Sequence, residues 1–73
     1  MTDPASSFLD HLLKHEVLVR LTTGDEIRGV LSTIDSASNV YLQKCSEYSN
    51  GDLVQTYEDV LVRGINVQFI SLP

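Results

Sequence analysis

The fold is decided by residues 16–34, EVLVRLTTGDEIRGVLSTI. Val17, Val19 and Leu21 recur at every second position, which is the period of a strand with one buried face. A tight turn is expected at residues 23–25, Thr-Gly-Asp, because glycine accepts backbone conformations that other residues avoid. The pattern therefore predicts two antiparallel strands, over residues 16–22 and 26–34.

Three more strands are predicted downstream. Val40 and Leu42 alternate with Tyr41 and Gln43 in a strand reaching roughly residue 48, and a fourth strand covers residues 53–62. Asn50-Gly51 between them is a strong hairpin signal, because both residues adopt a positive φ at low cost. After a turn at residues 63–64, a short fifth strand is predicted in which Val67 and Phe69 share one face.

A single amphipathic helix is predicted over about residues 4–15. Pro4 is tolerated in a first helical turn, and Asp3 is a suitable cap. Apolar residues then fall at helical spacing and form one face that must be covered. These residues are Phe8, Leu9, Leu12 and Leu13.

Together these elements predict a mostly β fold. An N-terminal α-helix is followed by a strongly bent, five-stranded, antiparallel, partly open barrel over about residues 16–72, in one domain spanning residues 1–73. Such a barrel leaves edges with unpaired backbone groups, and the fifth strand lacks the lysine or internal proline that would protect it. If it pairs with a different strand of a neighbour, the contact is head-to-tail and closes into a ring or runs on as a filament.

Composition narrows the possible functions. The chain has 73 residues, a net charge of −5 and one cysteine, Cys45, so it has no internal disulfide and does not grip nucleic acid by bulk charge. No secretory signal and no stretch of membrane-spanning length is visible, which favours a soluble intracellular protein. His11 and His15 are four residues apart but have no acidic third ligand nearby, and Cys45 has no evident base. We expect no enzyme, no metal and no cofactor.

Two segments resemble the motifs of the Sm/LSm family. Residues 16–42 resemble the first Sm motif, and residues 61–70 resemble the second. The matching residues of the first are Gly24, Gly29, Asp35 and Asn39, and those of the second are Val62-Arg63-Gly64, Asn66-Val67 and Phe69-Ile70. Within the family the chain is most similar to the F-type branch, and to the LSm rather than the Sm member of it. The cues are Phe8-Leu9, Glu47-Tyr48, Asn50-Gly51, Tyr57, Asp59 and Arg63-Gly64.

The resemblance implies a function. Members of the family form rings of six or seven subunits, in which the fourth strand of one subunit pairs with the fifth strand of the next. Uridine-rich single-stranded RNA binds at the central opening. The rings act in splicing and in mRNA decay, in the nucleus and the cytoplasm. No membrane and no DNA partner is implied.

The resemblance also implies the site. Asn39 matches the position that hydrogen-bonds the base edge, and Asp35 matches the carboxylate that orients that asparagine. Arg63 matches the guanidinium that packs on the base, and Gly64 lets its turn approach the RNA. Ala37 departs from the pattern, because many relatives place a broad stacking side chain there. Ser38 also replaces an apolar residue.

Other interpretations remain open. Asp35 and Asn39 are also common turn residues that bond their own backbone, and Arg63 is a candidate partner for Asp59 in a surface ion pair. With Ala37 at the stacking position, the chain could be a scaffold subunit that completes a ring without gripping RNA. A small barrel that binds peptides by strand addition is a third possibility, and it predicts a stable monomer.

Overall fold

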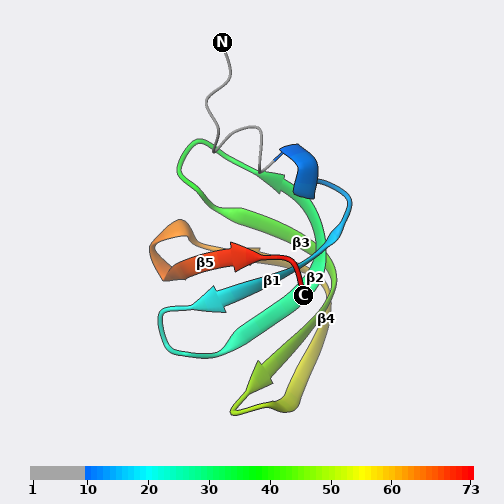
Figure 1. Cartoon of the computed structure of the whole chain (residues 1–73), viewed down its shortest axis with the longest axis vertical. Helices are drawn as coiled ribbons and strands as arrows, with labels where there is room; N and C mark the ends of the chain where they lie inside the picture. Colours follow the sequence, from blue (N-terminus) through cyan, green and yellow to red (C-terminus); the bar gives the residue numbers. More distant parts are fainter. Residues whose placement is uncertain (1–9) are drawn as a thin grey trace.

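The computed structural model describes residues 10–73 as a strongly curved antiparallel sheet (Figure 1). The strands are β1 (Glu16–Leu21), β2 (Glu26–Ile34), β3 (Val40–Ser49), β4 (Asp52–Val62) and β5 (Val67–Ser71), with a 3₁₀ turn η1 (Gly64–Asn66) before β5. The predicted fold class is confirmed, and the boundaries of β1 to β4 lie within one residue of their predictions. No helix within residues 10–73 has the length and apolar character needed to cross a membrane.

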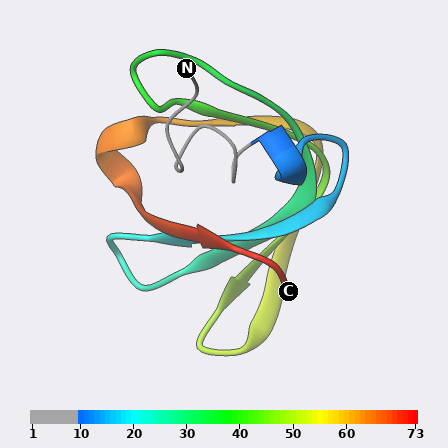
Figure 2. The same cartoon turned by 45° about the horizontal axis from the view of Figure 1, so that its top comes forward.

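The strand order leaves the barrel open. The order is β4-β3-β2-β1-β5, so in this chain β4 and β5 are both edges and do not pair with each other. A hollow of about 290 Å³ is lined mainly by the end of β4 and the turn after it, with Leu21 of β1 and Ile27 of β2 on its other side. Figure 2 shows how strongly the sheet curls. Both edge strands therefore present free backbone groups to a neighbour.

The inner face of the curl forms the core. Alternation in β1, β2 and β3 places one side chain in two toward the interior, as the period of two requires. The buried residues are Leu12, Val17, Val19, Ile27, Leu31, Val40, Leu42, Cys45 and Val62. Tyr41 and Gln43 lie on the opposite, solvent-facing side of β3. The predicted alternation in the first and third strands is confirmed.

The sharp bend of β2 and β3 is centred on Gly29 and Cys45. The pairing register shifts at Gly29, and Lys44 opposite has a φ of 53°, which marks a bulge in β3. A Cβ on Gly29 would lie 2.9 Å from Cys45 Sγ and 3.0 Å from Gln43 O. Gly29 is therefore required by close packing, and Cys45 fills the space as a buried apolar group.

The helix ends earlier than predicted. Residues 4–9 of the predicted helix lie outside the described part of the chain, and helical conformation continues only to residue 12. Lys14 has a φ of 66°, and its N–H donates to Leu31 O across the turn into β1. Leu12 is buried, but Leu13 is exposed because it belongs to this turn and not to the apolar helix face.

The prediction that Val67 and Phe69 share one face of the fifth strand is wrong. A register shift between Arg20 and Leu21 puts a bulge into the pairing of β1 with β5, so Val67 and Ile70 pack on the core while Phe69 turns outward. Phe69 is 47% exposed, with the Arg20 guanidinium carbon 5.8 Å from its ring centroid. The alternation rule fails here because one extra residue changes which side chains share a face.

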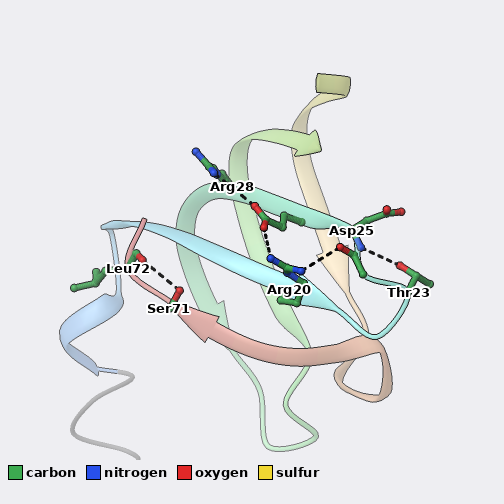
Figure 3. A network of polar contacts seen from close by, with 8 residues as sticks. Arg20, Thr23, Asp25, Arg28, Ser71 and Leu72 are labelled. Atoms are coloured by element: carbon green, nitrogen blue, oxygen red, sulfur yellow. Dashed lines mark hydrogen bonds and ion pairs between the residues drawn. The ribbon is translucent and has the colours of Figure 1, made fainter. Parts of the chain in front are cut away.

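A charged cluster covers this outer face (Figure 3). Arg20 and Arg28 both bind the Glu26 carboxylate, Arg28 at 3.5 Å, and Arg28 lies 4.9 Å from the centroid of the Tyr48 ring. Two of the five basic residues of the chain thus share one carboxylate, whose single negative charge offsets one of their two positive charges. Each of the two guanidinium groups also lies over an aromatic ring.

We expect Gly29→Ala to destabilise the folded protein. The new Cβ has backbone neighbours as well as Cys45 Sγ, so overpacking should lower the free energy of unfolding by about 1–3 kcal/mol. Urea denaturation would measure the loss. Adding Cys45→Ala should recover only part of it, because the Gln43 carbonyl remains. An unchanged urea midpoint for Gly29→Ala would contradict the close approach.

Candidate nucleic-acid interface

The register of β3 and β4 brings two loops together. Val40 at the start of β3 pairs with Val62 at the end of β4. The loop before β3 (residues 35–39) and the turn after β4 (residues 63–66) therefore continue side by side from a common pair. Both lie at the same end of the sheet (Figure 2, green and orange). All five predicted site residues lie in these two segments: Asp35, Ala37, Asn39, Arg63 and Gly64.

The Asp35 carboxylate organises the first loop. Its Oδ1 accepts the N–H groups of Ala37 at 2.9 Å and of Asn39 at 3.0 Å, and its Oδ2 accepts the Asn39 side-chain amide at 3.0 Å. The loop backbone adds hydrogen bonds from Asp35 N to Asn39 O and from Ser38 N to Asp35 O. Asp35 is thus a turn residue that bonds its own backbone, and it also orients Asn39. The interpretation of Asp35 as a turn residue and its interpretation as the group that orients Asn39 are therefore compatible.

The Asn39 side chain joins the two segments. Its Oδ1 accepts the Gly64 N–H at 2.8 Å, while its Nδ2 donates to Asp35. A backbone N–H can only donate and an ionised carboxylate can only accept, so the orientation of the amide is fixed. One N–H and one oxygen lone pair remain unused by these two contacts. The side chain is half-buried at the surface of the site.

The loop keeps Asp35 ionised. Hydrogen bonds from the Asn39 side chain and backbone, with a further one from the Ala37 backbone, lower the pKa of Asp35 below its ordinary value of 3.8. Desolvation opposes this effect and is outweighed. The carboxylate is therefore an acceptor throughout the neutral range, which is the state that the Asn39 amide requires.

Gly64 is required by close contact. A Cβ at this position would lie 2.4 Å from Ala37 O and 3.0 Å from Ser38 O. The missing side chain lets the η1 turn lie against the first loop and lets its N–H reach Asn39. Approach of the turn to a ligand stays a prediction, and within the protein the missing side chain allows the contact between the two loops.

Arg63 extends from the site into solvent. Its backbone is extended, with φ −68° and ψ 140°, and its side chain is exposed. Within residues 10–73 its guanidinium makes no ion pair, so the alternative of a surface pair with Asp59 is wrong. Arg63 is thus a cation beside Asn39 that no described carboxylate neutralises.

Ala37 offers little contact area. It lies at the exposed tip of the loop, and its methyl group has no face on which a base could stack. Ser38 beside it has a φ of 63°, a conformation that costs free energy for a residue with a Cβ. The tip is therefore shaped by backbone hydrogen bonds and not by packing.

Sequence reasoning missed Tyr41. Its hydroxyl donates to Asp35 Oδ2 at 3.4 Å, the same oxygen that accepts the Asn39 amide. The available signal was its position two residues after Asn39, which places both side chains on one face of an extended chain.

Metal and catalytic alternatives gain no support. Among residues 10–73, no group of three His, Cys, Asp or Glu side chains is arranged to hold a metal ion. His11 and His15 are both exposed. Burial and the nearby Asp59 charge raise the pKa of Cys45, which disfavours the reactive thiolate.

We expect Gly64→Ala to separate the two loops. The added methyl would collide with the Ala37 carbonyl, so the Asn39 Oδ1 to Gly64 N–H hydrogen bond must lengthen or break. Overpacking of this kind should cost about 1–3 kcal/mol in the free energy of unfolding. Urea denaturation checks the loss, and hydrogen exchange at the Gly64 amide position would rise. Unchanged stability would mean that the turn has room to move away.

The lowered pKa of Asp35 gives a stability contribution that acid removes. Because the folded-state pKa lies below 3.8, the contribution is present above that pH and is lost as the pH falls through the folded value. Asp35→Asn should therefore lower Tm at pH 7, and the difference from wild type should shrink below pH 3.8. Circular dichroism melts across pH 3–7 measure this. Asp52→Asn, in the exposed far hairpin, should change stability by no more than about 0.5 kcal/mol at any pH. A gap that stays constant with pH would contradict the prediction.

Comparison with known proteins agrees with this geometry. The family model described as the LSM domain matches residues 7–72. A protein of Coccidioides immitis named U6 snRNA-associated Sm-like protein LSm6 is 44% identical over 69 residues, which cover 94% of this chain and 85% of that protein.

Two solved structures have the same fold. The Pyrococcus abyssi Sm protein in complex with a uridine heptamer superposes with a TM-score of 0.87 at 34% identity, covering 96% of this chain and 97% of that one. The P. aerophilum SmAP1 heptamer gives a TM-score of 0.89 at 32% identity, covering 100% and 97%. A family match over nearly all of the sequence, together with the Asp35–Asn39–Gly64 arrangement, shows that the chain belongs to the LSM domain family.

Proposed function

We propose that this chain is a subunit of a ring-shaped Sm-like complex that binds uridine-rich single-stranded RNA. One observation carries the proposal. The Asn39 amide is held from both ends by Asp35 and Gly64, and it retains one donor and one acceptor for a ligand. A fixed amide with both functions free is suited to reading the edge of a base.

The remaining groups of the amide fit uracil better than cytosine. Uracil presents an N3–H donor beside carbonyl acceptors, so the Asn39 lone pair would accept from N3–H while its free N–H donates to a carbonyl. Cytosine has an acceptor at N3 and an amino donor at C4, which reverses the pattern. The orientation imposed by Gly64 and Asp35 prevents the amide from turning to suit cytosine.

Arg63 would complete the nucleotide site. Its exposed guanidinium lies next along the chain to Gly64 and has no described carboxylate partner. A planar cation of this kind can pack on the face of a base or pair with phosphate. Ala37 supplies no stacking surface on the other side, so this subunit should hold its nucleotide less tightly than an aromatic-bearing subunit.

Assembly into a ring follows from the two open edges. β4 and β5 lie at opposite ends of the strand order, and each exposes apolar side chains, among them Leu53, Leu61 and Phe69. Pairing of β4 of one subunit with β5 of the next would cover both edges. This contact is head-to-tail, and it forms a ring when the rotations between successive subunits add up to a full turn. The similar archaeal protein is a heptamer, and we propose a ring of six or seven subunits here.

The cellular role is proposed from the relatives. A relative associated with U6 snRNA supports a part in pre-mRNA splicing in the nucleus, and mRNA decay in the cytoplasm is the second role proposed for such rings. We further propose that the chain is the LSm member of the F-type branch, with the Glu47-Tyr48 and Asn50-Gly51 residues as its support. The subunit would bind RNA and carry out no chemistry of its own.

A scaffold role is the second candidate, and Ala37 is the observation that favours it. The loop tip has neither a stacking side chain nor a positive charge. In that case the chain would complete the ring while its neighbours hold the RNA.

We expect Asn39→Ala and Arg63→Ala each to weaken RNA binding. Oligouridylate is titrated into the ring assembled with its natural partner subunits and followed by fluorescence anisotropy. Each substitution should lower affinity by about 5- to 30-fold, because each removes a base contact worth about 1–2 kcal/mol. Lys44→Ala removes the same charge from an exposed position outside the two loops and should change affinity by less than about 3-fold.

Native mass spectrometry on the same samples separates the possible results. An intact ring that binds RNA and is insensitive to both substitutions would favour the scaffold role. An intact ring that ignores oligouridylate at low salt would overturn RNA binding altogether. A chain that stays monomeric at micromolar concentration and joins no LSm subunit would overturn the ring itself.

A further inference from the structure

We infer that Tyr41 is a positioning residue of the RNA site, whose hydroxyl ties the Asp35 carboxylate, and through it the Asn39 amide, to the sheet. The inference rests on the proposed function and extends it to a residue outside the matched motif positions. The phenol donates to Asp35 Oδ2 at 3.4 Å, and that oxygen also receives the Asn39 Nδ2–H at 3.0 Å.

Tyr41 differs from the other donors to Asp35 in where it is anchored. Ala37 and Asn39 belong to the same loop as Asp35, so their hydrogen bonds shape the loop without fixing it relative to the barrel. Tyr41 lies within β3, where its backbone is paired with Thr33 on one side and Leu61 on the other. Among residues 10–73 it supplies the one side-chain donor to Asp35 from inside a strand.

The Asn39 amide needs such an anchor. Its Oδ1 end is held by the Gly64 backbone, but its Nδ2 end is only as well placed as the exposed carboxylate of Asp35. Asp35 Oδ1 already accepts two N–H groups of the loop, so the Tyr41 hydroxyl adds a contact to Oδ2 from a paired strand. Without that contact the loop and its carboxylate could shift together, which would move the amide and reduce its selectivity for a base edge. Groups that fix a contacting side chain from a rigid element preserve such geometry.

The composition of this loop increases the dependence on positioning. Ala37 provides no stacking area, so the nucleotide held here relies more on hydrogen-bond direction. Ser38 in a left-handed conformation makes the tip a strained turn that depends on its hydrogen bonds. A tether from β3 counteracts both weaknesses without adding bulk at the loop tip.

Direct stacking of a base on the Tyr41 ring is a competing explanation for any effect of this residue. The ring is 36% exposed and borders a hollow of about 270 Å³ that Gln43 and Leu61 also line. The two explanations make different predictions. Tyr41→Phe keeps the aromatic face and removes only the hydroxyl, so it affects the tether and leaves stacking intact.

The test is a double-mutant cycle on the assembled ring. Affinities for oligouridylate and oligocytidylate are measured for wild type, Tyr41→Phe, Asn39→Ala and the double variant. We expect Tyr41→Phe to lower oligouridylate affinity by about 3- to 5-fold, the usual net effect of one hydrogen bond, and to reduce the preference for uridine over cytidine. In the Asn39→Ala background the same change should have less than about a 2-fold effect, because there is no amide left to position.

A matched control uses Tyr48→Phe, which removes a hydroxyl at the far end of β3 while keeping the ring that packs on Arg28. It should leave both affinities unchanged, and native mass should show intact rings for every variant. Unchanged affinity in Tyr41→Phe, or an equal loss with and without Asn39, would overturn the positioning role. If the wild-type ring itself fails to bind, the proposed function fails, and that result is distinct from failure of the Tyr41 inference.

Discussion

The pairing register between β3 and β4 is the constraint on which the rest of the structure depends. Once Val40 is opposite Val62, both can be buried, and the loops that continue from this pair bring the Asn39 side chain to the Gly64 N–H. A shift of one residue would turn the apolar side chains of one strand to solvent and would separate the two halves of the site. Core formation and site formation therefore require the same register.

That register depends on a bulge. Near the Asn50-Gly51 turn the pairs run from Ser49 with Asp52 to Tyr48 with Leu53, and the shift between Glu47 and Tyr48 then moves β4 by one residue. Without it, Asn39 would be opposite Val62. Asn50 and Gly51 have φ values of 52° and 85°, as the predicted hairpin turn requires. The turn alone does not determine the site, because the bulge changes which residues meet at the other end.

Most of the fold could be predicted because its signals are local. Alternating residues such as Val17 and Val19 identify strands, and Asn50-Gly51 identifies its own turn. Features that depend on a second strand were missed. The outward turn of Phe69 follows from a bulge against β1, and the helix ends early because Lys14 bonds to Leu31 in β2. The contact of Tyr41 likewise depends on the folded loop, which brings the Asp35 carboxylate next to a side chain of β3.

The charge distribution explains why hydrogen-bond geometry has to carry recognition. Of the five basic residues, Arg20 and Arg28 lie beside Glu26 on the outer face, and Arg63 is the one that belongs to the two loops. With a net charge of −5, long-range attraction for RNA is weak or unfavourable. Affinity at this subunit must then come from short-range contacts whose directions are set in advance. The chain from Tyr41 to Asp35, Asn39 and Gly64 is the part of the molecule that sets them.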